Sequence, residues 1–401
     1  MLLTERQRSG IGACTKLLSA RTVNGITLIK YKKCYGVHPA KMPELNVLLT
    51  VKDRPQFTRR WLDYASRVSL PFAICIADGG CNDAVPKLLE ENSYANISIT
   101  YIRFTPDESY RSYYAKIRTA LEEIESEFCL MADDDDFYSV DGICRCIGFL
   151  KVNTEFAACQ GLTFQFTLSA EQSLLYAKST LFGRALMPFY DFLDKSADLR
   201  LARLSNKNVR VWYAVQRTAD VLGVWRFIES AGIEDLFLAE MAFSFAIVAR
   251  GNVKCLNVPY YFRQHVTANS SNQALHATRG NLASRMRDPA FMAEVEKISN
   301  WLARKFKPEH ASLNVFENTV REALGLYIRN VLSSGKELPA SNRVLVRLKL
   351  RLKQLIIDTP LLSSFVNWLT PRFNIPESIR KQYFNDTDTV IAVITRRPGN
   401  Q

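Results

Sequence analysis

Short apolar runs alternate with longer amphipathic segments from residue 45 to residue 132. Continuous apolar runs of about 4–8 residues are typical of buried strands, and apolar positions three or four residues apart are typical of helices. The pattern predicts strands over 45–51, 72–78, 97–104 and 128–132. It also predicts three helices between them: one over 55–68, a short one that ends at 91, and one over 112–127. Strands that alternate with helices predict an α/β fold with an open, mostly parallel sheet flanked by helices.

The alternation continues beyond residue 132 and then changes. It predicts further strands over 155–168, 208–216 and 251–265, and helices over 217–232 and 234–250. A polar stretch follows Ala268, and helical patterns resume over 290–306 and 316–332. The first 42 residues show no clear periodicity. We therefore predict three parts: an N-terminal extension over 1–42, a ligand-binding domain over 43–270 and a mainly helical C-terminal region over 271–401.

The composition is that of an ordinary globular protein, with 47% hydrophobic and 23% charged residues. The formal charge of +12 favours acidic partners such as nucleic acid, anionic lipid or phosphorylated small molecules. No motif combines aromatic and basic residues as nucleic-acid-binding proteins do, so we expect no nucleic-acid partner. We expect a cytoplasmic location, because no apolar run is long enough to span a membrane, the N-terminus is charged, and the nine cysteines are scattered.

Four consecutive aspartates, Asp133 to Asp136, directly follow the predicted strand 128–132. Adjacent carboxylates repel one another, and a divalent cation relieves that repulsion. Mg²⁺ and Mn²⁺ prefer carboxylate oxygens together with substrate phosphates. Ligands of open α/β sheets bind at the carboxyl ends of the strands, where this run lies. The alternative interpretation is a solvated acidic loop.

Three sequence motifs, LTVKDRP, ICIADGG and LMADDDDFYSVDGI, resemble strand motifs of family-2-type glycosyltransferases with the GT-A fold. Asp133, Asp135, Asp136 and Asp141 fit the family's spacing, although Val140 stands where a proline is common. The resemblance covers about 46–265. It implies a hexosyltransferase-type enzyme that transfers a sugar, with inversion and with Mn²⁺ or Mg²⁺, from a nucleotide-sugar, here expected to be a UDP-sugar. The expected acceptor is a glycan or a lipid-linked carrier in cell-surface glycan synthesis.

The resemblance also implies roles for individual residues. Asp135 would be the main metal ligand, with Asp136 and His265 as further ligands. The expected donor-binding residues are Thr50, Asp53, Arg54, Asp78, Lys116, Arg118, Asp133 and Asp134. Among them, Asp78 would accept a hydrogen bond from the nucleobase. The alternatives are a turn role for Asp78, a strand-end role for Thr50 and a solvated helix face for Lys116 or Arg118.

An inverting transfer needs a carboxylate that takes the proton of the acceptor hydroxyl. Glu240 lies eleven residues before Gly251, as the resemblance requires, and it interrupts a long apolar helix. Asp235, in the dipeptide Glu234–Asp235, is the other candidate, although acids are also favoured at helix N-termini for structural reasons. We expect Glu240 to be the base.

One further segment and two alternative functions complete the sequence analysis. The basic, amphipathic segment 342–356 predicts either a helix that contacts an anionic membrane surface or a helix packed on the rest of the protein. A non-catalytic nucleotide-binding module on the same fold is an alternative to the enzyme. A sugar-phosphate nucleotidyltransferase is another, but the first predicted strand is not followed by the glycine-rich loop such an enzyme needs.

Overall fold

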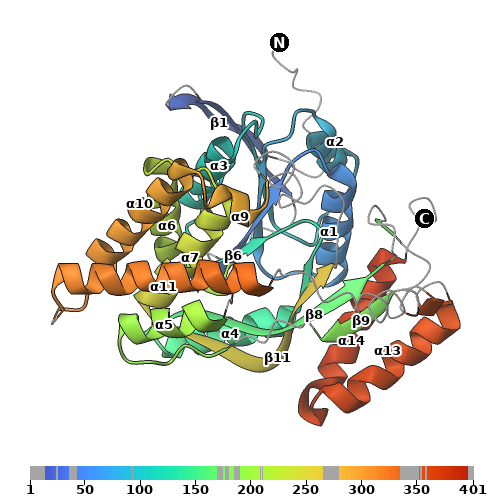
Figure 1. Cartoon of the computed structure of the whole chain (residues 1–401). Helices are drawn as coiled ribbons and strands as arrows, with labels where there is room; N and C mark the ends of the chain where they lie inside the picture. Colours follow the sequence, from blue (N-terminus) through green and yellow to red (C-terminus); the bar gives the residue numbers. More distant parts are fainter. Residues whose placement is uncertain are drawn as a thin grey trace. The chain divides into compact units, whose positions relative to one another are not determined.

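The structure is a computed structural model that describes residues 14–23, 26–35, 43–92, 94–168, 175–176, 180–184, 190–207, 209, 211–264, 280–309, 311–334, 352, 355–356 and 359–395. The chain forms two compact units, Met1–Asp134 and Asp135–Gln401, which we describe separately. The predicted fold class is confirmed: open sheet structure with mainly parallel central strands is flanked by helices, and a helical C-terminal region follows (Figure 1).

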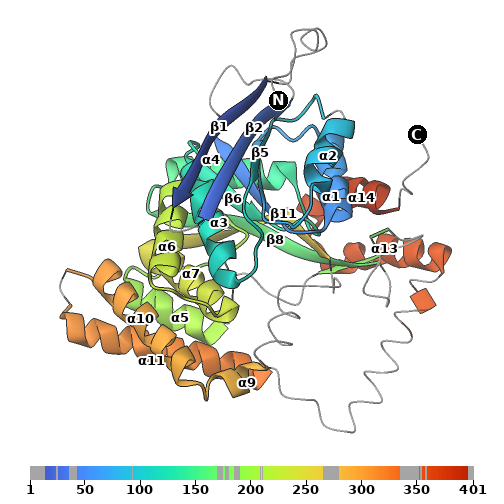
Figure 2. The ribbon, with the colours of Figure 1, turned by 90° about the horizontal axis from the view of Figure 1, so that it is seen from above.

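The first unit is an α/β layer structure. Its elements are β1 (Cys14–Val23), β2 (Ile26–Tyr35), β3 (Leu45–Val51), α1 (Pro55–Arg67), β4 (Ala73–Asp78), α2 (Ala84–Glu91), β5 (Ile99–Arg103), α3 (Tyr110–Glu122) and β6 (Phe128–Ala132). The strand order is β1-β2-β5-β4-β3-β6, and the four strands from β5 to β6 are parallel. Helices α1 and α2 cover one face and α3 the other (Figures 1 and 2). Helices on both faces explain why β3, β4 and β6 are almost continuously apolar.

The sequence predicted no strand in the N-terminal segment, and the structure has two there. Strands β1 and β2 pair antiparallel as a hairpin, and β2 pairs antiparallel with β5 (Figure 2). This segment therefore extends the sheet of the first unit at the edge next to β5. The pairing was not predictable from periodicity, because β2 contains lysines at positions 30, 32 and 33 that break the alternation of apolar and polar residues.

The second unit contains a smaller group of strands. They are β7 (Phe137–Tyr138), β8 (Phe156–Thr167), β9 (Leu181–Arg184), β10 (Val215–Arg217) and β11 (Asn252–Gln264), in the order β10-β8-β11-β7, with β9 also on β8. Strands β8 and β11 run parallel, and the other pairs are antiparallel. The strand expected over 208–216 is wrong for most of its length. Residues 211–214 form a turn whose carbonyls accept hydrogen bonds from the buried Gln216 side chain.

Helices form the rest of the second unit. They are α4 (Val140–Val152), α5 (Ala197–Lys207), α6 (Thr218–Ser230), α7 (Leu236–Arg250), α9 (Leu282–Arg285), α10 (Pro289–Phe306), α11 (Leu313–Ser334), α13 (Pro360–Asn374) and α14 (Glu377–Ile394). Helix α7 is buried almost throughout and contacts α5, α6 and α10 (Figure 1). The buried Arg200 of α5 donates to the carbonyls of Val248 and Ala249 at 2.8 Å each and so caps the C-terminal end of α7.

Within the described residues, no helix is both long enough and apolar enough to cross a bilayer. The predicted amphipathic segment 342–356 lies outside the described residues except for 352, 355 and 356. All seven cysteines whose side chains are described are free thiols.

Candidate functional site

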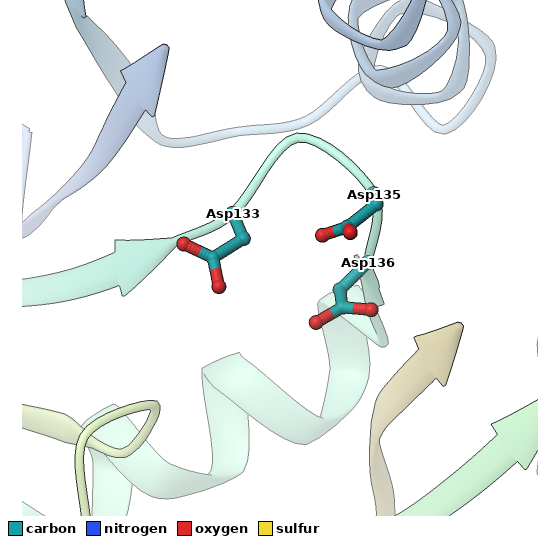
Figure 3. Close-up of side chains that lie close together, drawn as sticks. All are labelled: Asp133, Asp135 and Asp136. Atoms are coloured by element: carbon teal, nitrogen blue, oxygen red, sulfur yellow. The ribbon is translucent and has the colours of Figure 1, made fainter. Parts of the chain in front are cut away.

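Three carboxylates of the aspartate run face one another at the carboxyl end of β6 (Figure 3). Asp133, Asp135 and Asp136 each offer an oxygen, and these oxygens lie within 4.8 Å of one another. Within the described part of the chain, no other group of three histidine, cysteine or acidic side chains is arranged to share one ion. We call these three residues the aspartate cluster. Its ligand atoms are all hard oxygens, which suits Mg²⁺ or Mn²⁺.

The remaining member of the run, Asp134, is neutralised inside the protein. Its Oδ1 lies 3.2 Å from Nη2 of Arg54, and its Oδ2 lies 3.5 Å from Oγ1 of Thr58. Asp134 is only 4% exposed. The four aspartates therefore have two different environments, because one pairs with Arg54, the N-cap residue of α1, while the other three gather together.

Asp136 is fixed by the end of strand β11. Its Oδ1 accepts a hydrogen bond from the backbone N–H of Gln264 at 2.7 Å, and its Oδ2 accepts one from the hydroxyl of Tyr261. Burial, followed by the charge of Asp136, raises the pKa of Tyr261, which keeps this hydroxyl protonated as a donor. His265, the further metal ligand that the sequence predicts, lies outside the described residues. Asp141 is exposed on α4, where it pairs with Arg145 at 2.7 Å.

Asp78 lies at the carboxyl end of β4 and is 1% exposed. Its Oδ1 accepts from the backbone N–H of Gly80 at 2.8 Å, which is the turn role considered from the sequence. Its Oδ2 accepts from the hydroxyl of Tyr101 at 2.8 Å and from Nη1 of Arg103 at 2.7 Å. Burial, followed by the Asp78 charge, raises the pKa of Tyr101, so its hydroxyl stays protonated.

Asp53 connects two loops at the same end of the sheet of the first unit. Its Oδ1 accepts hydrogen bonds from the backbone N–H of Cys81 at 2.6 Å and from the side chain of Asn82 at 3.3 Å. Asp53 has a φ of 50°, a left-handed conformation that aspartate tolerates better than most residues. Thr50 is half-buried near the end of β3. These two predicted donor-binding residues thus belong to a defined loop structure.

Lys116 and Arg118 have different environments on α3. Lys116 is buried, and its Nζ donates to Asp107 and, at 3.2 Å, to the carbonyl of Val51. Burial lowers the pKa of Lys116 and raises that of Asp107, and the attraction between the two charges opposes both shifts. Arg118 pairs with Glu122 one turn further along α3, at 2.6 Å. The solvated-face alternative therefore does not describe Lys116.

The two candidates for the general base also differ. Asp235 is the N-cap of α7: its Oδ1 accepts from the N–H groups of Phe237 at 3.0 Å and Leu238 at 3.2 Å, and its Oδ2 pairs with Arg285. It is 2% exposed. Glu240 is half-buried on the second turn of α7. Asp235 thus has a structural role at the N-terminus of α7.

Sequence reasoning missed several residues that shape these groups, namely Tyr101, Arg103, Asp107 and Tyr261. Tyr101 and Arg103 carried a usable signal, because alternate positions of a strand share one face and Arg103 ends β5. Asp107 and Tyr261 carried none, since their partners are nine and 125 positions away in elements of different type.

No protein-family model and no curated protein matches the sequence. Among solved structures, the chain is similar to TarS from S. aureus with 10% identity and a TM-score of 0.45, over 87% of this chain and 54% of that one. A shorter form, TarS 1-349 in complex with UDP-GlcNAc, gives 10% identity and a TM-score of 0.46 over 88% and 89% of the two chains. The mannosyltransferase PcManGT from Pyrobaculum calidifontis, in complex with GDP-Man and Mn²⁺, gives 12% identity and a TM-score of 0.37 over 84% and 90%. The chain thus spans about half the length of the first of these structures.

Proposed function

We propose that the protein is a metal-dependent glycosyltransferase that moves a sugar from a nucleotide-sugar, expected to be a UDP-sugar, to an acceptor hydroxyl with inversion. The acceptor is a glycan or a lipid-linked carrier of cell-surface glycan synthesis. The observation that carries the proposal is the aspartate cluster at the carboxyl end of β6, in a chain whose strand motifs resemble those of family-2-type glycosyltransferases.

The residues of the cluster fit a divalent ion. Three carboxylates supply three oxygen ligands, and Mg²⁺ and Mn²⁺ usually keep further positions for water and substrate phosphates. Asp135 would be the main ligand, with Asp133 and Asp136 beside it. When bound, the ion neutralises charge on the leaving nucleoside diphosphate. Arg54 already neutralises Asp134, so we assign Asp134 to holding the aspartate run against the N-terminus of α1.

Asp78 supports nucleobase recognition in the first unit. A carboxylate has about four acceptor positions, and three of those of Asp78 are used by Gly80, Tyr101 and Arg103. The remaining position suits a nucleobase N–H. The fixed geometry also favours binding, because these three donors hold the carboxylate in place before any ligand arrives.

Glu240 is our choice for the general base. Its carboxylate takes the proton from the acceptor hydroxyl while that oxygen forms a bond to the anomeric carbon. The bond from the anomeric carbon to the diphosphate oxygen breaks with its electron pair, and the nucleoside diphosphate leaves. Asp235 is excluded from this role in our proposal because its oxygens cap α7 and bind Arg285.

Titration calorimetry of UDP, with and without Mn²⁺, tests the donor site. Wild type should bind UDP more tightly with Mn²⁺, and Asp135→Ala should lose that metal dependence. Asp220→Asn is the matched control, because Asp220 pairs with Arg250 on the surface and should not alter binding. Failure of wild type to bind UDP, GDP, CDP or dTDP in either condition would refute the proposal.

Turnover needs a second assay. Release of nucleoside diphosphate from UDP-GlcNAc or GDP-mannose, measured with candidate acceptors, should depend on Mn²⁺ and on Glu240. Metal-dependent binding without any turnover across acceptors would favour the non-catalytic nucleotide-binding module.

A further inference from the structure

Helix α13 turns its apolar face toward solvent and its polar face toward the rest of the unit, which is the reverse of a usual helix of a soluble domain. Leu361, Leu362, Phe365 and Trp368 are 86%, 37%, 54% and 50% exposed. Their spacing of one, four and seven residues from the first places all four on one face of the helix. We call these four residues the outward face of α13. The rings of Phe365 and Trp368 stack there with centroids 6.0 Å apart.

The opposite face of α13 is held to the protein by polar contacts. Asn367 accepts a hydrogen bond from the backbone N–H of Phe182 at 2.9 Å and donates to the carbonyl of Thr180 at 2.6 Å. Ser363, one turn earlier, is 1% exposed. An amphipathic helix normally turns its apolar stripe toward the core. These contacts fix the opposite orientation, so the exposure of the apolar residues is a built feature of the helix.

Exposed apolar side chains are concentrated in this part of the sequence. Among the described residues, twelve large hydrophobic side chains are exposed, and six of them lie between positions 352 and 368. The outward face supplies four, and Leu352 and Leu355 precede it with 57% and 59% exposure. Single exposed apolar residues are common, whereas a contiguous group marks an interaction surface.

The charge of the surrounding sequence selects the partner. Helix α13 contains no acidic residue and one basic residue, Arg372. The sequence from 338 to 359, which leads into the helix, has one acidic residue, Asp358, and five basic ones, at positions 343, 347, 349, 351 and 353. A net positive sequence that precedes an apolar, aromatic helix face suits anionic lipid headgroups above an apolar interior. A second copy of the chain would bring the same positive charge and be repelled.

We propose that the outward face of α13 docks on an anionic lipid bilayer, with Trp368 and Phe365 at the level of the headgroups. Aromatic side chains favour that interfacial level, and the exposed leucines provide apolar area to bury beneath it. This surface does not depend on the donor chemistry proposed above, and its test uses neither nucleotide nor metal.

Trp368 makes the docking measurable by fluorescence. Of the five tryptophans, Trp61, Trp212 and Trp225 are buried and Trp301 is half-buried, so Trp368 alone is largely exposed. On addition of vesicles of phosphatidylcholine and phosphatidylglycerol, the emission of the full chain should shift to shorter wavelength. Lipids brominated on their acyl chains should quench it. Trp368→Phe should still sediment with these vesicles but lose most of the shift and the quenching.

Vesicle sedimentation tests the surface itself. The triple variant Leu361→Ser, Phe365→Ser, Trp368→Ser should bind the vesicles at least about tenfold more weakly than wild type, since each truncation removes apolar area from the contact. Leu199→Ser with Met292→Ser is the control, because these residues are 54% and 49% exposed elsewhere in the unit. Vesicles of phosphatidylcholine alone should bind wild type less well than the anionic vesicles.

Three results would overturn the proposal. One is equal vesicle binding by wild type and the triple variant, and another is no binding by wild type. The third is a wild-type dimer in light scattering that the triple variant converts to a monomer, without vesicle binding, which would assign the surface to a second copy. Circular dichroism of the triple variant should match wild type, since all three positions are exposed.

Discussion

Replacing Asp235 and replacing Glu240 should affect the protein in opposite ways. Asp235 caps α7 and forms a buried ion pair with Arg285, whereas Glu240 is half-buried on the second turn of the same helix. We expect Asp235→Asn to lower stability and to leave the turnover of each folded molecule intact. Glu240→Gln should preserve stability and strongly lower turnover.

The magnitude for Asp235 follows from its contacts. Asparagine is as good an N-cap as aspartate, so Asp235→Asn keeps the hydrogen bonds to Phe237 and Leu238 and removes mainly the charge. Leaving Arg285 buried without its partner should cost about 3–5 kcal/mol. Asp235→Ala also removes the cap and should cost about 1 kcal/mol more. Adding Arg285→Met to Asp235→Asn should recover part of the loss.

The magnitude for Glu240 is kinetic. A general base contributes roughly 10²–10⁴-fold to rate, so Glu240→Gln should lower turnover by that factor while the free energy of unfolding changes by less than about 1 kcal/mol. Urea unfolding followed by circular dichroism measures the free energy of unfolding. Release of nucleoside diphosphate per folded molecule measures the turnover.

The reverse result would refute this reasoning. If Asp235→Asn unfolds at the wild-type urea concentration but loses turnover, Asp235 is the base and its cap geometry is incidental. If turnover survives both substitutions, the base lies on another element.

Three further outcomes follow from other described contacts. Lys116→Met should lower the free energy of unfolding by about 3–5 kcal/mol, because it leaves the buried Asp107 carboxylate without its cation. The double variant with Asp107→Asn should lose less stability than the sum of the two single variants. Additive losses in urea unfolding would contradict a coupled pair. Gly79→Ala should lower the Tm, because the new Cβ overlaps the Asp107 carboxylate, whereas Gly223→Ala, which has open space within a helix, should raise stability by up to about 1 kcal/mol. Burial raises the pKa of Asp386 from 3.8 to about 6, so the folded state binds this proton more tightly than the unfolded state does. The stability that the bound proton gives the folded state is therefore lost as the pH rises from about 4 to about 6. The Tm of Asp386→Asn minus that of wild type should therefore increase from pH 4 to pH 6, and a constant difference would count against the buried site.

The central strands were predictable because their environment is uniform. Strands β3 and β6 begin and end where the sequence predicted, since a parallel strand covered on both faces is a continuous apolar run bounded by polar residues. The hairpin of β1 and β2 is an added edge without such a run. Helix α13 was expected only as part of a mainly helical region, and Pro371 inside it is a residue that usually breaks a helical pattern.

The candidate site was predictable in its composition but not in its division of roles. The run of four aspartates is visible in the sequence, whereas the neutralisation of Asp134 depends on Arg54, eighty positions earlier. The burial of Lys116 likewise depends on Asp107 and on the end of β3. Metal and donor roles of individual residues, and the division of the chain at 42 and 270, stay predictions.

The buried contacts at the start of α7 limit where the chain can be cut. A fragment that ends at the predicted boundary near 270 would retain Asp235 but lose Arg285, its ion-pair partner, and Glu294, whose carboxylate accepts the backbone N–H of Asp235 at 3.2 Å. The N-terminus of the helix that carries Glu240 would then contain a buried charge with neither contact. An expression fragment intended to fold therefore has to continue through α10, so the smallest folded fragment is longer than the sequence motifs suggest.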